Sequence, residues 1–525
     1  MSKNPLKFFW ADCRRQLPYR RYLELEDRPR RLKSQAFSLL TLVLGATYLI
    51  WLTRLVFSHR GAQDFLFLIA EVLAYSLLSF LAFDIWHVRH HRPEGLEPRE
   101  NLPVDVFVPC CGEPLEIIGT TLKAVSRIAY QPLQVYVLDD AGSSQVAAMA
   151  SSYGFSYLSR PLAGVSHRDA KGGNLNFGFS QTQGELILVL DADQIPAPDI
   201  LSRLTGFFNL DRVAYVQTKQ SFCLPEGDPF YNRDEIFYET VQSANDQANA
   251  VISCGSGVLY RRRALAEMGG FATWNIVEDL TTSYELLSRG WKGVYFPYAL
   301  SRGLAPMTLA GVYRQRFQWC LDAMRLFFWD NPLLKRGLSW SQRCHFLLFM
   351  FSYLVSGLVF PAFYLLPLLG YWSGYCCFRG HELAYLALRG VYLISTIIMF
   401  KYLFFRKDAL KQFKMLCGLF PVYLAAIVTA LFYPPGRKPL YRINNRFIYY
   451  PPGGWPFLMP HIFLIFLNFT LPFVSLSLGW APPQLIVFNA LFSAFTIWVL
   501  TDLVVAGLRK PRWPPAMDPR QVYGP

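Results

Sequence analysis

The sequence has few charged residues and lacks the cysteine spacing of a zinc site. Only 17% of its 525 residues are charged, whereas 53% are hydrophobic and 16% are aromatic. This composition excludes an ordinary soluble protein and indicates a membrane protein with a substantial soluble part. None of the ten cysteines belongs to a C-x-x-C pair or has a histidine at zinc-site spacing, so we interpret them as reduced, structural residues.

The sequence also lacks a pattern typical of a cleaved signal peptide, because its first apolar run begins late and no small-residue cleavage site accompanies it. Residues 1–35 contain ten lysines and arginines against four acidic residues. By the positive-inside rule, this basic segment predicts a cytoplasmic N-terminus. The arginines behind the net charge of +14 flank apolar segments, so we expect the lipid bilayer and no nucleic acid as a partner.

Six apolar runs are long enough to cross roughly 30 Å of hydrocarbon as helices. A further apolar segment, residues 406–434, contains Pro421 and begins with basic residues. If it crossed the membrane, the basic stretch GRKPLYRINNR would lie outside, so we interpret it as an interfacial helix and place both chain termini in the cytoplasm. We predict nine parts in chain order: a basic N-terminus (1–35), two spans (36–88), a soluble domain (89–306), amphipathic interfacial helices (307–345), two spans (346–405), an interfacial helix (406–434), a loop (435–455), two spans (456–505) and a tail (506–525).

Residues 89–306 have a different pattern from the apolar runs on either side. Short β-rich runs such as VDVFVP, QVYVL, ELILVL and VAYVQT alternate there with helical, polar or glycine-rich segments. This alternation predicts an α/β domain with a mostly parallel sheet, inserted between the transmembrane helices.

Two of the predicted strands end in carboxylates. LILVLDADQIP ends in Asp191 and Asp193, and QVYVLDDAG ends in Asp139. The carboxyl ends of strands form the usual ligand crevice of an α/β sheet, and hard oxygen ligands suit Mg²⁺ or Mn²⁺ bound to a diphosphate. An aspartate-rich turn is the alternative for either motif alone, but two strands that bring carboxylates to one edge favour a ligand site.

Three further segments carry residues suited to a binding or catalytic site. RDAKGGNLNFG places Lys171 beside two glycines, which suits contact with a phosphate or nucleotide. ISCGSGVLYRR places the small residues Gly255, Ser256 and Gly257 where a substrate could approach the backbone closely. VEDLTT places Glu278 and Asp279 at the start of a helical run, although an acid there is also an ordinary helix N-terminal residue.

In this order and between membrane spans, the motifs resemble those of processive family 2 glycosyltransferases of the cellulose synthase type. The family's T-E-D appears as Val277-Glu278-Asp279, its K-A-G-N-L-N as KGGNLN from Lys171, and its Q-x-x-R-W as QRFQW from Gln315. Its gating-loop motif F-x-V-T-x-K has a loose match at Tyr441, Asn444 and Arg446. The resemblance covers roughly residues 100 to 505 and implies a GT-A-like nucleotide-sugar transferase domain.

The resemblance implies a role for each matching residue. Asp279 would be the catalytic base that deprotonates the acceptor hydroxyl, Asp139 would contact the nucleotide, and Asp191 and Asp193 would hold the metal–diphosphate. Trp319 would form a stacking floor for the acceptor's terminal sugar. The remaining residues are Cys254, Gly255 and Glu278 on the acceptor side and Lys171, Arg314, Gln315, Arg316 and Gln318 on the donor side.

One motif departs from the family pattern, because Gln318 stands where the family has an arginine that helps to neutralise the leaving diphosphate. Glutamine donates hydrogen bonds but carries no charge. Arg314 lies four residues earlier on the same predicted helix face, and Arg316 could also turn toward the site. We interpret the departure as a relocated cation, with a catalytically weakened enzyme as the alternative.

The resemblance predicts a membrane-embedded, processive, inverting β-glycosyltransferase in the cell inner (plasma) membrane, with its catalytic domain in the cytoplasm. It would polymerise a nucleotide sugar, with UDP-glucose the favoured donor, into a β-glucan-type polysaccharide and secrete the chain through its own transmembrane channel. One alternative is a non-processive transferase that adds a single sugar to a lipid acceptor; another is an inactive transferase-like scaffold or transporter. We expect no cyclic-di-GMP-binding domain in this chain, which leaves export or regulation to partner subunits.

Overall fold

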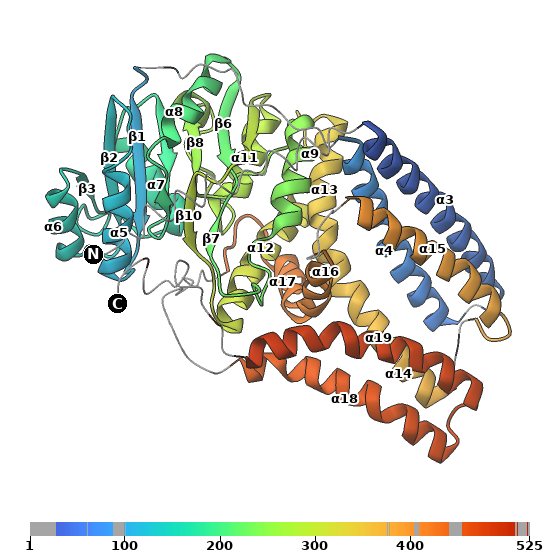
Figure 1. Cartoon of the computed structure of the whole chain (residues 1–525). Coiled ribbons are helices and arrows are strands. Elements are labelled where there is room, and N and C mark those ends of the chain that lie inside the picture. The colour runs from blue at the N-terminus through green and yellow to red at the C-terminus, as the bar shows by residue number, and fades with distance from the viewer. Residues whose placement is uncertain are drawn as a thin grey trace.

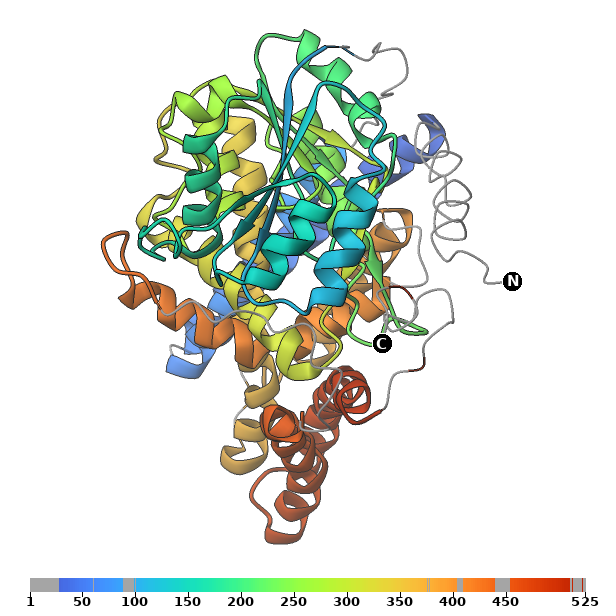
Figure 2. The ribbon, with the colours of Figure 1, turned by 90° about the vertical axis from the view of Figure 1, so that its left-hand side faces the viewer.

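The structure of the chain is a computed structural model that describes residues 28–59, 61–87, 99, 101–374, 376, 378–403, 409–439, 454–509, 512 and 522. An α/β domain lies at one end of the molecule, and long apolar helices make up the other end (Figure 1). Figure 2 shows the domain from its outer side, with the two red C-terminal helices projecting away from it.

The α/β domain is built on a seven-stranded sheet in the order β3-β2-β1-β4-β8-β6-β9. Among these described strands, β8 alone runs antiparallel to its neighbours, β4 and β6. The predicted mostly parallel sheet is therefore confirmed. The strands are β1 (Val104–Cys110), β2 (Leu133–Asp139), β3 (Ser156–Leu158), β4 (Leu186–Val189), β6 (Val213–Thr218), β8 (Val258–Arg261) and β9 (Lys292–Phe296).

Helices cover both faces of this sheet, which is why the central strands are apolar on both sides. In β1, Val106 and Val108 pack into one core cluster and Phe107 packs into another on the opposite face. The helices of the domain are α5 (Leu115–Val125), α6 (Ser144–Ser152), α7 (Ala170–Gln181), α8 (Ile200–Leu204), α9 (Gln242–Gln247), α10 (Arg262–Ala266) and α11 (Glu278–Ser288).

A second, three-stranded sheet lies between the main sheet and the membrane helices (Figure 1). Its strand order is β5-β10-β7, with β5 at Ile195–Pro196, β7 at Phe222–Cys223 and β10 at Ser301–Leu304. Because β5 follows directly after the carboxylates at the end of β4, this sheet supports the edge on which they lie.

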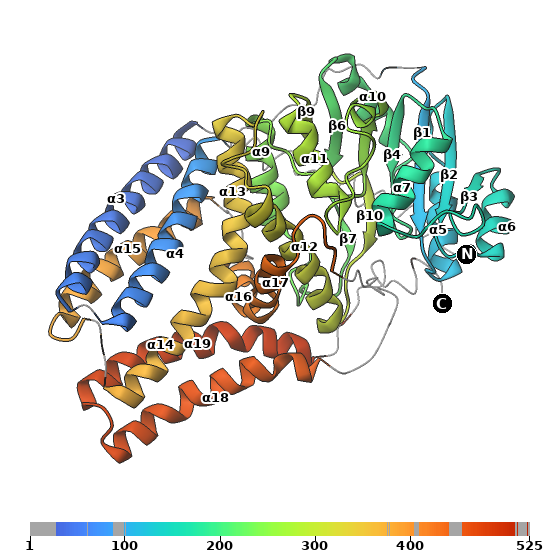
Figure 3. The ribbon, with the colours of Figure 1, turned by 180° about the vertical axis from the view of Figure 1, so that it is seen from behind.

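The described part of the chain contains six helical stretches long and apolar enough to cross a membrane, which confirms the prediction of about six. Helices α3, α4 and α15 lie side by side far from the sheet, and α18 and α19 form a separate pair (Figures 1 and 3). The stretches are α3 (Arg28–His59), α4 (Ala62–His87), α13 (Trp340–Leu354) continuing through η3 (Val355–Val359) into α14 (Phe360–Ser373), α15 (Glu382–Leu403), α18 (Trp455–Leu478) and α19 (Pro483–Leu508).

The segment that we expected to be one interfacial helix is a bent pair, α16 (Ala409–Gly418) and α17 (Phe420–Phe432). The two helices meet at 53°, and they would make a seventh span if they crossed the membrane together. Pro421 lies in the first turn of α17, where its ring cannot continue the preceding helix. The bend therefore lies at the proline noted in the sequence.

The helix that carries the Gln315 motif is α12 (Leu309–Trp329), which packs along α17 and also contacts α11 and α13. Thr308 caps its start by accepting a hydrogen bond from Gly311 N at 3.1 Å. Tyr441, Asn444 and Arg446 of the predicted gating loop lie outside the described residues.

Candidate active site

The two carboxylate-bearing strands end at the same edge of the main sheet. Asp139, the last residue of β2, is in register with Cys110 at the end of β1. On the other side of β1, Val189 of β4 is in register with Phe107, so Asp191 follows two residues beyond. The parallel register thus brings Asp139 and Asp191 to one edge, on either side of β1.

Asp139 is buried and its carboxylate is held by three donors. Oδ1 accepts a hydrogen bond from Ala141 N at 2.8 Å, while Oδ2 accepts from Ser143 N at 2.7 Å and from the Tyr157 hydroxyl at 2.8 Å. Burial and the hydrogen bond to Asp139 raise the pKa of Tyr157 to about 12, so the phenol stays a donor. This network fixes the carboxylate at the rim of the sheet.

Arg160 is a buried residue that the sequence interpretation missed. Its Nε donates to Asp140 Oδ1 at 2.7 Å, and its Nη2 forms an ion pair with Asp140 Oδ2. Arg160 also donates to the carbonyl oxygens of Arg168, at 2.7 Å, and Ala170, at 3.0 Å. It therefore ties the end of β2 to the residues directly before Lys171.

Lys171 contacts three other predicted site residues, each from a separate segment of the chain. Its Nζ lies 2.6 Å from Asp191 Oδ1, 2.7 Å from the Gly255 carbonyl oxygen and 3.2 Å from Glu278 Oε1. Burial alone would lower the pKa of Lys171, but Asp191 and Glu278 raise it above its ordinary value, so the ammonium group remains charged. We call Lys171, Asp191, Gly255 and Glu278 the lysine cluster.

Asp279 lies beside the lysine cluster in the first turn of α11. Its Oδ1 accepts a hydrogen bond from Leu280 N at 2.6 Å. Burial and the neighbouring Glu278 raise the pKa of Asp279 from 3.8 to about 7, although Lys171 acts in the opposite direction. A carboxylate with a pKa near neutrality is suited to general-base catalysis.

Gly255 allows the backbone to approach both charged groups. A Cβ atom at this position would lie only 2.8 Å from Asp279 Oδ2 and 3.2 Å from Lys171 Nζ. Its φ of +76° is also in the region that favours glycine. Any larger residue would push the Asp279 carboxylate and the Lys171 ammonium group apart.

The segment that leads into Asp279 is held by two charged residues of α12. Asp322 accepts hydrogen bonds from Ile276 N at 3.1 Å and Val277 N at 2.9 Å. Arg325, which is fully buried, donates to Asn275 Oδ1 at 2.9 Å. The sequence interpretation missed both residues, although two charged residues three apart in a mostly apolar helical stretch were the signal that could have found them.

A cavity of about 80 Å³ connects Asp279 with predicted acceptor-side residues. Asp279, Cys254 and Trp319 all line it, together with aromatic side chains from η2 (Phe237–Val241) and α13. Among the described residues, its lining consists of Gln220, Asp234, Phe237, Tyr238, Ile252, Ser253, Cys254, Val277, Asp279, Leu280, Trp319, Asp322, Phe349 and Tyr353.

The residues of the Gln315 motif have different surroundings. Arg314 is exposed on α12, whereas Gln315 and Gln318 are half-buried. Arg316 is buried, forms an ion pair with Asp234 at 2.6 Å, and lies with its guanidinium carbon 4.7 Å from the centre of the Trp319 ring. Arg316 therefore pairs with Asp234, which lines the cavity, and not with a carboxylate of the lysine cluster.

The two metal-ligand candidates have different environments. The Asp191 side chain is 22% exposed and paired with Lys171, whereas Asp193 is buried and accepts from Leu304 N at 3.3 Å. Among the described residues, no group of three or more His, Cys, Asp or Glu side chains gathers as a metal site. Two carboxylates are too few to enclose Mg²⁺ or Mn²⁺ alone, but they fit a cation that also binds the oxygens of a diphosphate.

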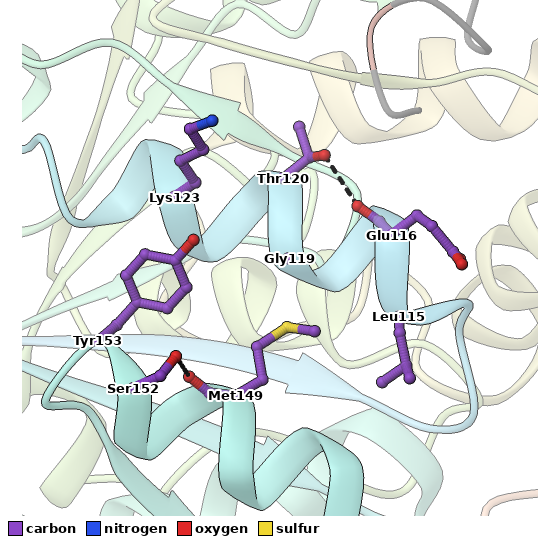
Figure 4. A pocket seen from close by; sticks show the side chains of 8 residues that line it. All are labelled: Leu115, Glu116, Gly119, Thr120, Lys123, Met149, Ser152 and Tyr153. Carbon is purple, nitrogen blue, oxygen red and sulfur yellow. Dashed lines mark hydrogen bonds between the residues drawn. The ribbon is translucent and has the colours of Figure 1, made fainter. Parts of the chain in front are cut away.

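An open groove of about 490 Å³ lies away from these residues, between α5 and α6 (Figure 4). Glu116 and Lys123 of α5 and Met149 and Tyr153 of the α6 region lie along it. None of the predicted site residues that the structure describes lines this groove, so we assign the chemistry to the edge of the sheet.

Comparison with known proteins gives similarities along the α/β domain and beyond it. Residues 101–321 match the family described as glycosyltransferase like family 2. The chain is 33% identical over 341 residues to cellulose synthase 1 catalytic subunit (UDP-forming) of Komagataeibacter xylinus, which covers 61% of this chain and 45% of that protein. It is 32% identical over 327 residues to cellulose synthase catalytic subunit (UDP-forming) of Xanthomonas axonopodis pv. citri (strain 306), with 59% and 44% coverage.

The matched region spans less than half of these curated relatives, and 22% of the longer cellulose synthase 1 of Komagataeibacter xylinus. Among solved structures, the fold is similar to mannosyltransferase PcManGT from Pyrobaculum calidifontis in complex with GDP-Man and Mn²⁺. The TM-score is 0.50 at 18% identity, and the match covers 70% of this chain and 99% of that chain. This likeness confirms the predicted transferase fold.

Proposed function

Because the chain is a membrane protein with a family 2 glycosyltransferase domain related to bacterial cellulose synthase catalytic subunits, we propose that it is an inverting, processive β-glycosyltransferase. It transfers a sugar from a cytoplasmic nucleotide donor to the end of a growing polysaccharide. UDP-glucose is the proposed donor, because the curated relatives are named UDP-forming cellulose synthases.

One observation carries the proposal: the Lys171 ammonium group and the Asp279 carboxylate both lie against Gly255, and Asp279 also lines an aromatic cavity. Transfer from a sugar diphosphate needs positive charge at the leaving group and a base at the acceptor hydroxyl. Lys171 supplies the charge and Asp279 supplies the base. Trp319, in the same cavity, gives the acceptor ring an apolar surface to stack on.

In the proposed reaction, an acceptor hydroxyl donates a hydrogen bond to Asp279 and loses its proton to that carboxylate as its oxygen attacks the anomeric carbon. The bond to the diphosphate breaks on the opposite face, which inverts the configuration. Asp139 contacts the nucleotide, and Lys171 stabilises the charge that develops on the diphosphate. Asp191 and Asp193 would hold Mg²⁺ or Mn²⁺, which supplies further positive charge to the diphosphate when bound.

The apolar helices support a further step, in which the product leaves the cell through the protein itself. The α12 helix with Trp319 lies between the sheet and α13, α16 and α17 (Figures 1 and 3). An acceptor stacked on Trp319 would point toward these helices. A non-processive enzyme with a lipid acceptor would use the same base and donor site but release a product with one added sugar.

Asp279→Asn tests the function directly in the purified full-length protein. The substitution keeps size and most hydrogen bonding but removes basicity, so transfer from radiolabelled UDP-glucose should fall at least about 100-fold while donor binding survives. Asp330→Asn, which alters an ion pair with Lys335 at the far end of α12, is the matched control and should leave transfer near the wild-type rate. Wild-type turnover by Asp279→Asn would remove Asp279 from the mechanism.

The length of the product distinguishes a processive enzyme from one that adds a single sugar to a lipid acceptor. Gel filtration of the radiolabelled product should show a polymer that linkage-specific β-glucanases digest. A product that extracts into organic solvent with a single added sugar would favour the lipid acceptor.

A further inference from the structure

The segment between β7 and α9 has an unusual backbone. Asp228, Tyr231 and Asp234 have φ values of 42°, 52° and 47°, in the left-handed region that non-glycine residues rarely adopt. The π-helix η2 (Phe237–Val241) follows directly. Strained residues and π-helical turns persist only where surrounding contacts hold them, and both are concentrated at functional sites.

Contacts from three other segments hold this backbone in place. Asn232 Nδ2 donates to the Pro306 carbonyl oxygen at 3.1 Å, and Lys411 of α16 donates to the Gly227 carbonyl oxygen. Arg316 of α12 donates to Asp234 Oδ2 at 2.6 Å, and Gln412 of α16 approaches Asp234 Oδ1 at 3.4 Å. Two helices thus fix the position of the Asp234 carboxylate.

The Asp234 carboxylate lines the same cavity as Asp279 and Trp319. A carboxylate has about four acceptor positions, and the contacts from Arg316 and Gln412 use two of them. A sugar ring presents an apolar face for stacking and hydroxyl groups around its rim. An aromatic floor with a second carboxylate at its side is therefore complementary to a sugar.

We propose that Asp234 is a specificity-determining residue of the acceptor site, where it accepts hydrogen bonds from hydroxyl groups of the sugar stacked on Trp319. The inference rests on the proposed glycosyltransferase function and extends it to the acceptor side. Arg316 is the positioning residue: it is buried, pairs with Asp234 Oδ2 at 2.6 Å and so fixes where the carboxylate lies beside the cavity. Arg316 therefore serves the acceptor rather than the leaving diphosphate.

The test compares the acceptor and donor kinetics of Asp234→Asn in the full-length enzyme, with cellotetraose as the acceptor probe. Loss of a charged hydrogen-bond acceptor should raise the KM for cellotetraose about tenfold and leave the KM for UDP-glucose within about twofold. Glu239→Gln is the matched control, because Glu239 pairs with Lys219 at 2.8 Å and is 19% exposed against 16% for Asp234, but does not line the cavity. This control should change neither KM.

A second variant distinguishes the loss of the contact between Asp234 and the acceptor from the effect of leaving the Arg316 charge without its partner. Asp234→Asn combined with Arg316→Gln removes both charges, so it should fold where the single change fails and should show the same rise in the KM for cellotetraose. If the KM for cellotetraose is unchanged in the variants that fold, or if the KM for UDP-glucose rises equally, the inference is wrong.

Binding of cellotetraose, measured by titration calorimetry, keeps this test independent of turnover. If wild-type protein transfers no sugar from any nucleotide donor, the proposed function is wrong. A loss of cellotetraose binding in Asp234→Asn but not in Glu239→Gln would still support the acceptor site. Equal binding by the wild type and Asp234→Asn would overturn it while leaving the glycosyltransferase function intact.

Discussion

Glu278→Gln should move the acid limb of the pH–rate profile to lower pH. The Asp279 carboxyl is half-buried, and desolvation and the negative charge of Glu278 raise its pKa to about 7. A protonated Asp279 cannot accept the acceptor's proton, so transfer should rise with pH through this pKa. Removing the Glu278 charge removes one of the two main causes of the raised pKa.

The size of the effect follows from the ionised fraction of Asp279. With a pKa of about 7, roughly 10% of Asp279 is ionised at pH 6 and about 90% at pH 8, so kcat/KM should rise about ninefold over this interval. A neighbouring like charge typically changes a carboxyl pKa by about one unit. In Glu278→Gln, kcat/KM at pH 6 should therefore already be about half of its value at pH 8.

Initial rates with radiolabelled UDP-glucose between pH 5.5 and 8.5 measure both profiles. Glu285→Gln is the control, because Glu285 lies on the same helix but pairs with Lys335 and Arg289, away from the cavity. Its acid limb should match that of the wild type. An acid limb near pH 4 in the wild type, or one that Glu278→Gln leaves in place, would refute the role of Asp279 as a base with a raised pKa.

Three other outcomes can be tested on the same protein. EDTA should abolish transfer reversibly, with recovery on adding Mg²⁺ or Mn²⁺, and Asp193→Ala should be inactive with metal present; full activity in chelator would contradict the metal site. In a background without competing native cysteines, a cysteine at Ser373 should react with an impermeant thiol reagent outside intact cells and one at Arg437 should not; labelling at Arg437 would mean that α16 and α17 cross the membrane. Arg325→Met leaves several buried acceptors without a donor, so it should lower the free energy of unfolding by about 3 kcal/mol. The control Arg263→Met changes a side chain that is 81% exposed and should alter the free energy of unfolding little. Equal denaturation midpoints for the two variants would refute the anchoring role of Arg325.

The sequence alone determined the features that depend on local periodicity and strand polarity. Long apolar runs identify helices that need a membrane, because exposing them to water is unfavourable. The β-rich runs identified the parallel strands, and parallel strands bring their carboxyl ends to one edge. For this reason the strand pattern alone predicts that Asp139 and Asp191 lie at the same edge of the sheet.

Only the tertiary structure decided which distant segments meet at that edge. The contacts of Lys171 with Asp191, Gly255 and Glu278 join residues up to 107 positions apart, and no local pattern encodes their distances. The same holds for Arg316, whose helix phase was predictable but whose partner Asp234 lies 82 positions earlier in the chain. A buried charge is stabilised by whichever opposite charge the packing brings to it, and packing is a property of the whole fold.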